Sequence, residues 1–155
     1  MASRVKKITS ISVGHFYERH HEALKLGLIG DSKEGFERTI REPAPNRPGL
    51  ALSGFFTYFA HKRIQVIGNS EASYLKKLAP ELRAQRFRQL CEKGVPCIVI
   101  SRDHVLPDEL LNIASEYNLT IFRTPMVTMQ FLNLASILLE QEFSESITLH
   151  GCMVD

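Results

Sequence analysis

The sequence predicts a small single α/β domain in which a mainly parallel sheet is flanked by helices. Two short apolar runs, 97–100 and 120–124, are separated by a segment, 107–117, whose apolar residues repeat with helical spacing. A strand, a helix and a second strand in that order form a right-handed unit with parallel strands. The chain has 155 residues, of which 44% are apolar and 23% charged, so it is long enough to bury one core.

The N-terminal part predicts one helix and two strands. Residues 1–11 are mixed in character, and we expect a frayed start there. Ser12 has the side chain of a helix N-cap, and the helix should run to about His20. Alternating apolar residues predict strands at 23–28 and 36–42, the first of which is followed by a Gly-Asp turn.

The most distinctive stretch of the chain follows. Three prolines fall within 43–49, which makes that segment an irregular loop inside the domain. A run of small and aromatic residues comes next. Residues 63–67 then alternate polar and apolar side chains and end at Gly68, which indicates a strand.

Helix signals surround the next two strands. Asn69 is the expected N-cap of a helix that runs through Leu78, with an acidic residue in its first turn. Pro80 suits the first position of another helix, which continues to residue 93 and which Gly94 can end. Asn118 can supply the left-handed cap of the helix at 107–117.

The segment 128–142 predicts a last helix with apolar residues on nearly all sides. We expect such a helix to be buried by its own sheet and also by a partner surface. Its apolar residues are Met129, Phe131, Leu132, Leu134, Ala135, Ile137, Leu138 and Leu139.

Composition excludes several classes of function. The formal net charge of +2 and the absence of a Lys/Arg block argue against a nucleic-acid partner. Three cysteines without a CxxC pair indicate neither a disulfide framework nor a zinc ribbon, and they suit a reducing compartment. No apolar run reaches the length of a membrane span. We therefore expect a cytoplasmic protein without a membrane partner.

Several motifs together resemble a known family. NRPGLALSGFF, then YF and RIQVIGNSE, lie between residues 46 and 71, and VPCIVI, IFRT and HGCMVD follow. This pattern is similar to the N-terminal domain of HPr kinase/phosphorylase, the bacterial enzyme that acts on a serine of the phosphocarrier protein HPr. The resemblance covers most of the chain from about residue 12 onward. It implies a fold similar to the N-terminal domains of the muramyl-peptide ligases.

The resemblance also implies a division of the chain. Residues 1–145 would be the N-terminal domain, and 146–155 a linker with the first strand of a C-terminal kinase domain. In the family the phosphate-binding loop follows the His-Gly segment, which would place His150 near the active site of the full-length enzyme. No G-x-x-x-x-G-K-[ST] loop occurs in this sequence, so the chain alone should be inactive as a kinase.

By the same resemblance, the full-length protein is a homo-hexamer that uses ATP and Mg to phosphorylate HPr and reverses the reaction with inorganic phosphate. The partners implied are therefore its own C-terminal kinase domain, further copies of itself and HPr. The present chain would hold no cofactor and would serve regulation and assembly in the control of carbon metabolism and the phosphotransferase system.

Three arginines are the candidate ligand-binding residues. Arg47 beside Pro48 could hold a carboxylate or phosphate with two hydrogen bonds, or it could satisfy carbonyl groups of the loop. Arg63 and Arg123 lie near predicted strand ends, where they could join Arg47 at one edge of the sheet.

Other polar and aromatic groups favour structural roles. The spacing of His15, His20 and His21 does not suit a metal site, and we expect a solvated helix end. Cys91 and Cys97 are expected to be small buried hydrophobes. The aromatic residues Phe55, Phe56, Tyr58 and Phe59 could stack on a ligand, but burial in the core or in an interface is the expectation.

Two alternatives to the kinase-associated domain stay open. One is a stand-alone small-molecule sensor of the same fold, with a site lined by Arg47 or Arg63 at the carboxyl edge of the strands. The other is an interaction module in which the helix at 128–142 and the aromatic residues 55–59 lie between subunits. A pocket at the arginines favours the first, and an exposed apolar surface favours the second.

Overall fold

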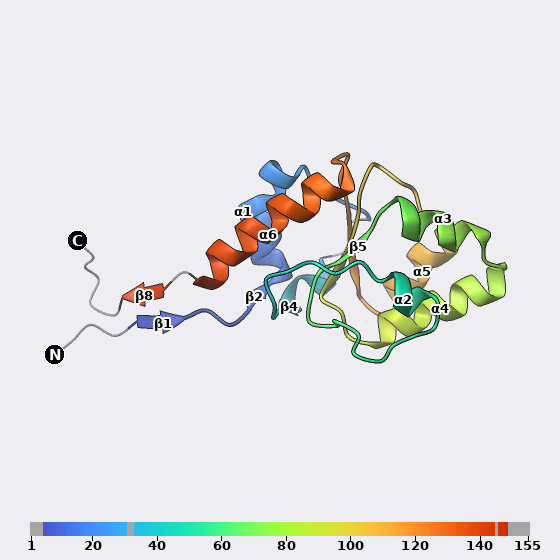
Figure 1. Ribbon diagram of the computed structural model, residues 1–155, viewed down its shortest axis with the longest axis horizontal. Coiled ribbons are helices and arrows are strands. Elements are labelled where there is room, and N and C mark those ends of the chain that lie inside the picture. The colour runs from blue at the N-terminus through green and yellow to red at the C-terminus, as the bar shows by residue number, and fades with distance from the viewer. Residues whose placement is uncertain (1–4, 31–32, 145, 149–155) are drawn as a thin grey trace.

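A mixed four-stranded sheet forms the centre of the domain. The computed structural model describes residues 5–30, 33–144 and 146–148. The strand order is β3 (Gly27–Leu28), β7 (Thr120–Arg123), β6 (Cys97–Ile100) and β5 (Gln65–Ile67). Helices lie against both faces of this sheet (Figure 1), so the predicted α/β architecture is confirmed.

The three strands β5, β6 and β7 are parallel, as the sequence predicts. Val66 lies opposite Val99, and Val99 lies opposite Phe122. The crossovers contain α3 (Asn69–Lys77) and α4 (Pro80–Glu92) between β5 and β6, and α5 (Asp108–Glu116) between β6 and β7. Each of these elements falls within about two residues of its predicted bounds, because its ends carry strong local signals.

Those local signals work as predicted at three helix ends. Ser12 Oγ accepts a hydrogen bond from the His15 N–H at 3.0 Å and caps α1 (Val13–Leu24). Gly94 and Asn118 both have a positive φ, 75° and 52°, and each directly follows the C-cap residue of its helix, α4 or α5. Asn69 is the first helical residue of α3 rather than its cap, and Gly68 takes the cap position.

The antiparallel strand β3 departs from the prediction. The helix α1 continues to Leu24, whose side chain is fully buried, and ends at Lys25 in the left-handed region. Only Gly27–Leu28 of the strand expected at 23–28 therefore remains, paired antiparallel with β7. Apolar residues at alternate positions occur both at the end of a buried helix and in a strand, so this short pattern could not distinguish the two.

Two small sheets lie outside the central one. β2 (Ile11–Ser12) pairs with β4 (Thr39–Ile40), and β1 (Val5–Lys7) pairs with β8 (Ser146–Thr148), both antiparallel. The frayed start expected at residues 1–11 is thus wrong for β1 and for Ile11, the first residue of β2. The pair β1 and β8 extends from one end of the molecule (Figure 1).

The segment 36–42 is a strand only in part. The 3-10 helix η1 (Glu34–Glu37) precedes β4 and packs against the start of β7. A Cβ at Gly35 would lie 2.5 Å from Thr120 Oγ1 and 2.6 Å from the Asn118 carbonyl oxygen. The close approach of the two backbones therefore requires glycine at position 35.

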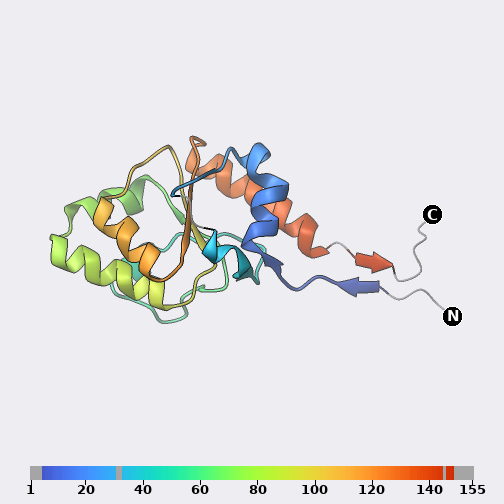
Figure 2. The same cartoon turned by 180° about the vertical axis from the view of Figure 1, so that it is seen from behind.

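The core is divided by the sheet into two layers. Val66, Val99 and Phe122 face α1 and α6 (Thr128–Ser144), whereas Ile98 and Ile121 face α3, α4 and α5. Figure 2 shows the two helical layers from behind. The alternation of neighbouring strand residues between two buried layers explains why these strands are apolar at successive positions.

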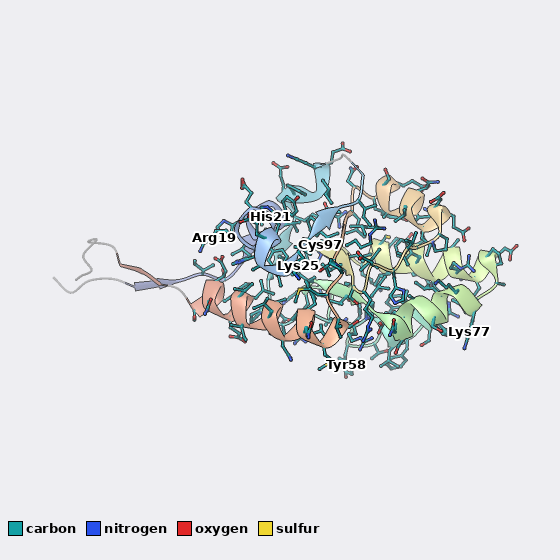
Figure 3. The ribbon with its side chains drawn as sticks, turned by 90° about the horizontal axis from the view of Figure 1, so that it is seen from above. Arg19, His21, Lys25, Tyr58, Lys77 and Cys97 are labelled. Carbon is teal, nitrogen blue, oxygen red and sulfur yellow. The ribbon has the colours of Figure 1, made fainter. Side chains whose placement is uncertain are left out.

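The cysteines behave as predicted. Cys91 and Cys97 are buried free thiols, and Cys97 lies in the interior of the molecule (Figure 3). Burial raises the pKa of each thiol to about 12, so both stay protonated and act as small apolar side chains.

The helices among the described residues are each too short or too polar to span a membrane.

Candidate functional site

The parallel strands bring Gly68, Ser101 and Thr124 to one edge of the sheet. These residues follow the carboxyl ends of β5, β6 and β7. The helices α3 and α6 begin at the same edge, one after β5 and the other after β7. Ligands of parallel α/β sheets bind at this edge, so its polar groups are the first place to look for a site.

Arg47 is the predicted site residue with the most defined geometry. Its Nε lies 3.1 Å from Glu71 Oε2 and its Nη2 lies 2.9 Å from Glu71 Oε1. The Glu71 side chain is only 5% exposed, and its Oε1 also accepts the Gly68 N–H at 2.8 Å. The guanidinium therefore balances a buried carboxylate, and Arg47 is held by the fold itself.

The backbone explains how Arg47 reaches this position. Asn46 runs parallel to β5, with hydrogen bonds from its N–H to the Ile64 carbonyl and from the Val66 N–H to its own carbonyl. Asn46 Nδ2 also donates to Gln65 Oε1 at 2.8 Å. The chain then turns at Pro48, and Arg47 is left at the carboxyl end of β5.

The start of α6 packs tightly against the end of β5. A Cβ at Gly68 would lie 2.7 Å from Thr128 Oγ1 and 2.8 Å from Arg47 Nη2. Thr128 Oγ1 is 2.6 Å from Ser101 Oγ, which also donates to the Ile67 carbonyl. The centre of the edge is therefore filled by side chains that bond to one another.

A more open part of the edge lies after β6 and β7. Arg102 and Asp103 are both in the left-handed region, with φ of 56° and 54°. Arg123 Nε is 3.9 Å from Asp103 Oδ1, and both residues line a cleft of about 300 Å³ together with Lys25. This cleft combines two cations and one carboxylate, a set that could bind a zwitterionic or anionic small molecule.

The three predicted arginines do not converge. Arg47 and Arg123 lie at the carboxyl edge, but Arg63 precedes β5 and pairs with Glu42 at 2.8 Å on the surface. Each arginine has a carboxylate neighbour of its own. His150 lies outside the described residues.

The histidines of α1 differ from the prediction. His20 is buried, with Nε2 2.8 Å from Glu142 Oε2, and His15 Nε2 is 3.3 Å from Glu142 Oε1. Arg19 Nε lies 3.6 Å from the same carboxylate. The solvated helix end expected there is therefore wrong for His20, because α6 brings a buried acid against α1.

The Glu142 carboxyl has a perturbed pKa. Burial raises it, but hydrogen bonds from His20 and His15 and the charge of Arg19 outweigh burial and hold the pKa below its ordinary value. The cluster thus fixes the carboxyl-terminal part of α6 on α1. No group of three metal-ligating side chains with metal-site geometry occurs among residues 5–30, 33–144 and 146–148.

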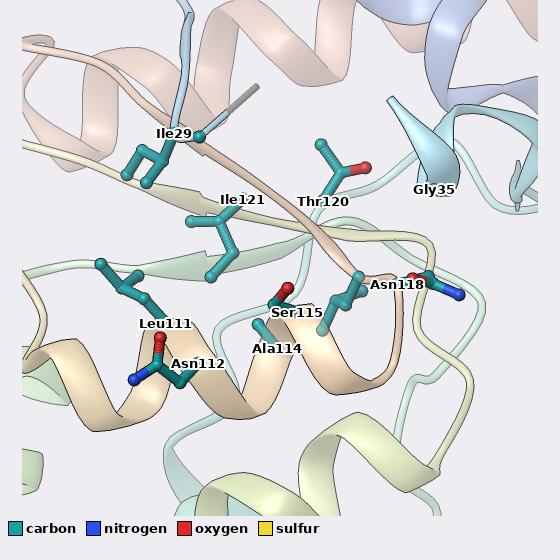
Figure 4. Close-up of a pocket in the computed structure, with 11 residues that line it drawn as sticks. Ile29, Gly35, Leu111, Asn112, Ala114, Ser115, Asn118, Thr120 and Ile121 are labelled. Carbon is teal, nitrogen blue, oxygen red and sulfur yellow. The ribbon is translucent and has the colours of Figure 1, made fainter. Parts of the chain in front are cut away.

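A further pocket lies beside α5, on the sheet face that α3, α4 and α5 cover (Figure 4). It has a volume of about 400 Å³ between α5, the strand β7 and the segment that follows β3, and aliphatic side chains such as Ile29, Leu111 and Ile121 form its wall. Asn112, Ser115 and the hydroxyl residue Thr120 also line it, and none of the described residues of the lining is charged. Sequence reasoning missed this pocket, because α5, β7 and Ile29 come together only in the folded chain.

Helix α2 (Gly49–Leu52) and the loop after it form an exposed apolar surface. Leu50, Phe55 and Tyr58 are 70%, 54% and 99% exposed, and Tyr58 has a φ of 59°. Phe56 and Phe59, in contrast, are partly buried and contact each other edge to face. The aromatic run is therefore divided between core and surface.

The sequence belongs to a recognised family. The family model described as HPr Serine kinase N terminus matches residues 11–139. This chain is a member of that family. The resemblance expected from the motifs in residues 46–71 is thus confirmed.

Curated relatives agree with this family assignment. The HPr kinase/phosphorylase of Chloroherpeton thalassium is 36% identical over 154 residues, and the match covers 96% of this chain and 44% of the relative. That of Enterococcus faecalis is 34% identical over 134 residues, covering 86% and 43%. The chain therefore spans less than half the length of these HPr kinase/phosphorylases.

A solved structure shares the fold. The CBS and DRTGG domains of the regulatory region of Clostridium perfringens pyrophosphatase, in complex with the activator diadenosine tetraphosphate, match with a TM-score of 0.53 and 15% identity. The match covers 82% of this chain and 46% of that chain. The comparison with muramyl-peptide ligases stays a prediction.

Proposed function

We propose that this chain is the non-catalytic regulatory and assembly domain of an ATP-dependent HPr serine kinase/phosphorylase in the control of bacterial carbon metabolism. The observation that carries the proposal is the family match over residues 11–139, combined with a sequence that has no G-x-x-x-x-G-K-[ST] loop. ATP, Mg and the serine of HPr would be bound by a further, C-terminal kinase domain in the cytoplasm.

The chemistry of the carboxyl edge supports a role without catalysis. Glu71 accepts from Arg47 and Gly68, and the hydroxyl of Ser101 bonds to Thr128. A nucleophilic hydroxyl needs a base within hydrogen-bond reach. The nearby His104 instead contacts Asn69, which leaves Ser101 without such a base among the described residues.

The first test is the coding sequence downstream of Asp155. A phosphate-loop motif within roughly thirty residues would support the proposal. A stop codon at that point would contradict it. Removing residues 1–145 from the longer product should then leave phosphotransfer to HPr measurable, while its assembly or its response to metabolites changes.

A small-molecule sensor is the second candidate. The pocket of about 400 Å³ beside α5 favours it, since a volume of this size can enclose a small ligand and the described residues of its lining carry no charge. Thr120 Oγ1 is buried without a hydrogen-bond partner among the described residues and could bond a ligand through a small shift. The neutral dye N-phenyl-1-naphthylamine should bind the unchanged chain saturably, and Ser115→Trp, which fills the pocket, should abolish that binding.

A further inference from the structure

We propose that the cleft beside Arg123 binds an acidic α-amino acid, aspartate or glutamate. The cleft has a volume of about 300 Å³ and is lined by the segment 25–29, Asp103, Arg123 and Pro125. Arg123 holds the α-carboxylate, Asp103 holds the α-ammonium group, and Lys25 holds the side-chain carboxylate. A ligand site of this kind goes beyond the regulatory and assembly role proposed above, and it does not depend on the kinase assignment.

The cleft lies where the chain leaves the sheet in two directions. After β6 the chain enters α5, which packs on the same face as α3 and α4, whereas after β7 it enters α6 on the opposite face. Asp103 belongs to the first connection, Arg123 ends β7, and Pro125 belongs to the second connection. Ligands of parallel α/β sheets bind outside the carboxyl ends of the strands, beside such a divergence. The position of the cleft therefore favours a small-molecule site.

The charged side chains of the cleft have unused hydrogen-bonding capacity. Arg123 Nε and Asp103 Oδ1 are 3.9 Å apart, which is too far for a hydrogen bond. Arg47 and Arg63, by contrast, each place a nitrogen within 2.9 Å of a glutamate oxygen. Within the described chain, the side chains of Lys25, Arg123 and Asp103 make no hydrogen bond. A guanidinium, an ammonium group and a carboxylate thus line one cleft with donors and acceptors left for a ligand.

The backbone fixes Asp103 beside Arg123. Arg102 and Asp103 are successive residues in the left-handed region, although neither ends a helix. The Arg102 N–H donates to the Met126 carbonyl at 2.9 Å, and the Asp103 N–H donates to the Thr124 carbonyl at 3.0 Å. These bonds tie the connection after β6 to the connection after β7. Strained backbone that the surrounding structure holds in this way is typical of ligand sites, where it places a side chain before the ligand arrives.

Gly27 leaves Arg123 uncovered on the neighbouring strand. It lies directly opposite Arg123 in the antiparallel pair of β3 and β7, where a side chain would stand beside that of its partner. A Cβ at Gly27 would meet only the Arg123 carbonyl oxygen, at 3.8 Å, and the φ of Gly27 is not positive. Neither packing nor the backbone requires glycine at this position, and the missing side chain keeps the cleft open.

The arrangement of charges selects the class of ligand. An α-amino acid carries its ammonium and carboxylate groups on one carbon atom, and Asp103 and Arg123 offer the two opposite charges side by side. Lys25 adds a second cation to the lining, which favours a second carboxylate over a neutral side chain. Leu28 and Pro125 supply apolar wall for the intervening methylene groups. A dicarboxylate without an ammonium group would instead place a like charge beside Asp103.

NMR titration of the ¹⁵N-labelled chain at constant ionic strength tests the proposed ligand. L-Glutamate and L-aspartate are the probes. Glutarate lacks the ammonium group, L-glutamine lacks the second carboxylate, and inorganic phosphate measures unspecific anion binding. We expect glutamate or aspartate to shift the amide signals of the cleft saturably, with a Kd below about 1 mM. The three comparison compounds should bind at least about tenfold more weakly.

Three variants locate the site. Arg123→Gln removes the guanidinium and Gly27→Val fills the cleft without a change of charge, and each should weaken glutamate binding at least about tenfold. Asp103→Asn keeps a residue that accepts the left-handed region, and it should remove the preference for glutamate over glutarate. The matched control is Arg63→Gln, because Arg63 pairs with Glu42 outside the cleft, and its binding should be unchanged. Circular dichroism verifies that each variant is folded.

Any of four results would overturn the inference. They are the absence of saturable binding of both amino acids, a comparison compound that binds as tightly as they do, an unweakened Arg123→Gln or Gly27→Val, and an Asp103→Asn variant that still prefers glutamate to glutarate. All measurements use the chain itself. They therefore stand apart from the kinase assignment, which the downstream coding sequence tests.

Discussion

Arg47 and Tyr58 belong to the same short stretch, yet the fold treats them in opposite ways. Arg47 is fixed by two hydrogen bonds to the buried Glu71, whereas the side chain of Tyr58 is almost entirely exposed. The beginning and end of residues 46–68 thus close the carboxyl edge of the sheet, and the middle forms a surface. One continuous motif therefore combines a structural part with a part that is available to a partner.

Among the changes considered, a substitution of Arg47 should have the largest effect on stability. Replacing it in Arg47→Ala should lower the free energy of unfolding by about 3 kcal/mol or more, because Glu71 would stay buried without its cation. Urea denaturation measures this. Arg63→Ala is the matched control, since Arg63 and Glu42 form an exposed pair, and it should cost less than about 1 kcal/mol. Equal losses in the two variants would contradict the structural role of Arg47.

Gly68 offers a second and smaller perturbation of the same corner. Its φ is −108°, so alanine is acceptable to the backbone, but the new Cβ would overlap Thr128 and Arg47. We expect Gly68→Ala to cost about 1–3 kcal/mol through overpacking, as measured by urea denaturation. The same substitution at Gly49 is the control, because its Cβ would meet only Glu71, at 3.9 Å. A neutral Gly68→Ala would mean that α6 can move away at little cost.

Glu142 belongs to a second cluster of polar side chains that contact one another, with His15, His20 and Arg19. Its folded pKa is lowered, so its contribution is present above the unfolded value of about 4.3 and is lost as the pH falls through the folded value. Glu142→Gln should lower the free energy of unfolding at neutral pH by about 1–3 kcal/mol, and the difference should shrink in acid. Chemical denaturation at several pH values measures this. If the difference in free energy of unfolding between Glu142→Gln and the unchanged chain stays constant with pH, the lowered pKa of Glu142 is contradicted.

The smallest expected effect is at Tyr58 and has the opposite sign. Asparagine accepts the left-handed region more readily than tyrosine, and the exposed ring contributes no burial. Tyr58→Asn should therefore raise the free energy of unfolding by up to about 1 kcal/mol. Thermal unfolding measures this effect. A loss of stability would show that the ring makes contacts within the chain.

The strongest sequence predictions were those whose signals are local. The strand Cys97–Ile100 was predicted with its bounds because it is a short apolar run between Pro96 and the polar residues that begin at Ser101. Helix α4 was predicted from Pro80 and Gly94, which act on the backbone wherever the chain folds. The end of α1 was missed, because the burial of Leu24 depends on elements far along the chain.

The candidate site was predictable only in part. The sequence pointed to Arg47 through its place beside Pro48, but nothing in the sequence linked it to Glu71. The relation of His15 and His20 to Glu142 was also hidden, because the spacing of the two histidines on α1 suggests no shared partner. Their shared partner, Glu142, lies on another helix, α6.

The sequence by itself determined the α/β class, the parallel strands β5, β6 and β7, and the family to which the chain belongs. These follow from periodicity, helix ends and motif, all of which act over a few residues. The tertiary structure alone decided which polar groups face one another and which aromatic side chains stay exposed. The physical reason is that the partner of a buried charge can come from any segment that the fold brings beside it. Such partners, like His20 and Glu142, are far apart in the sequence and therefore leave no local pattern.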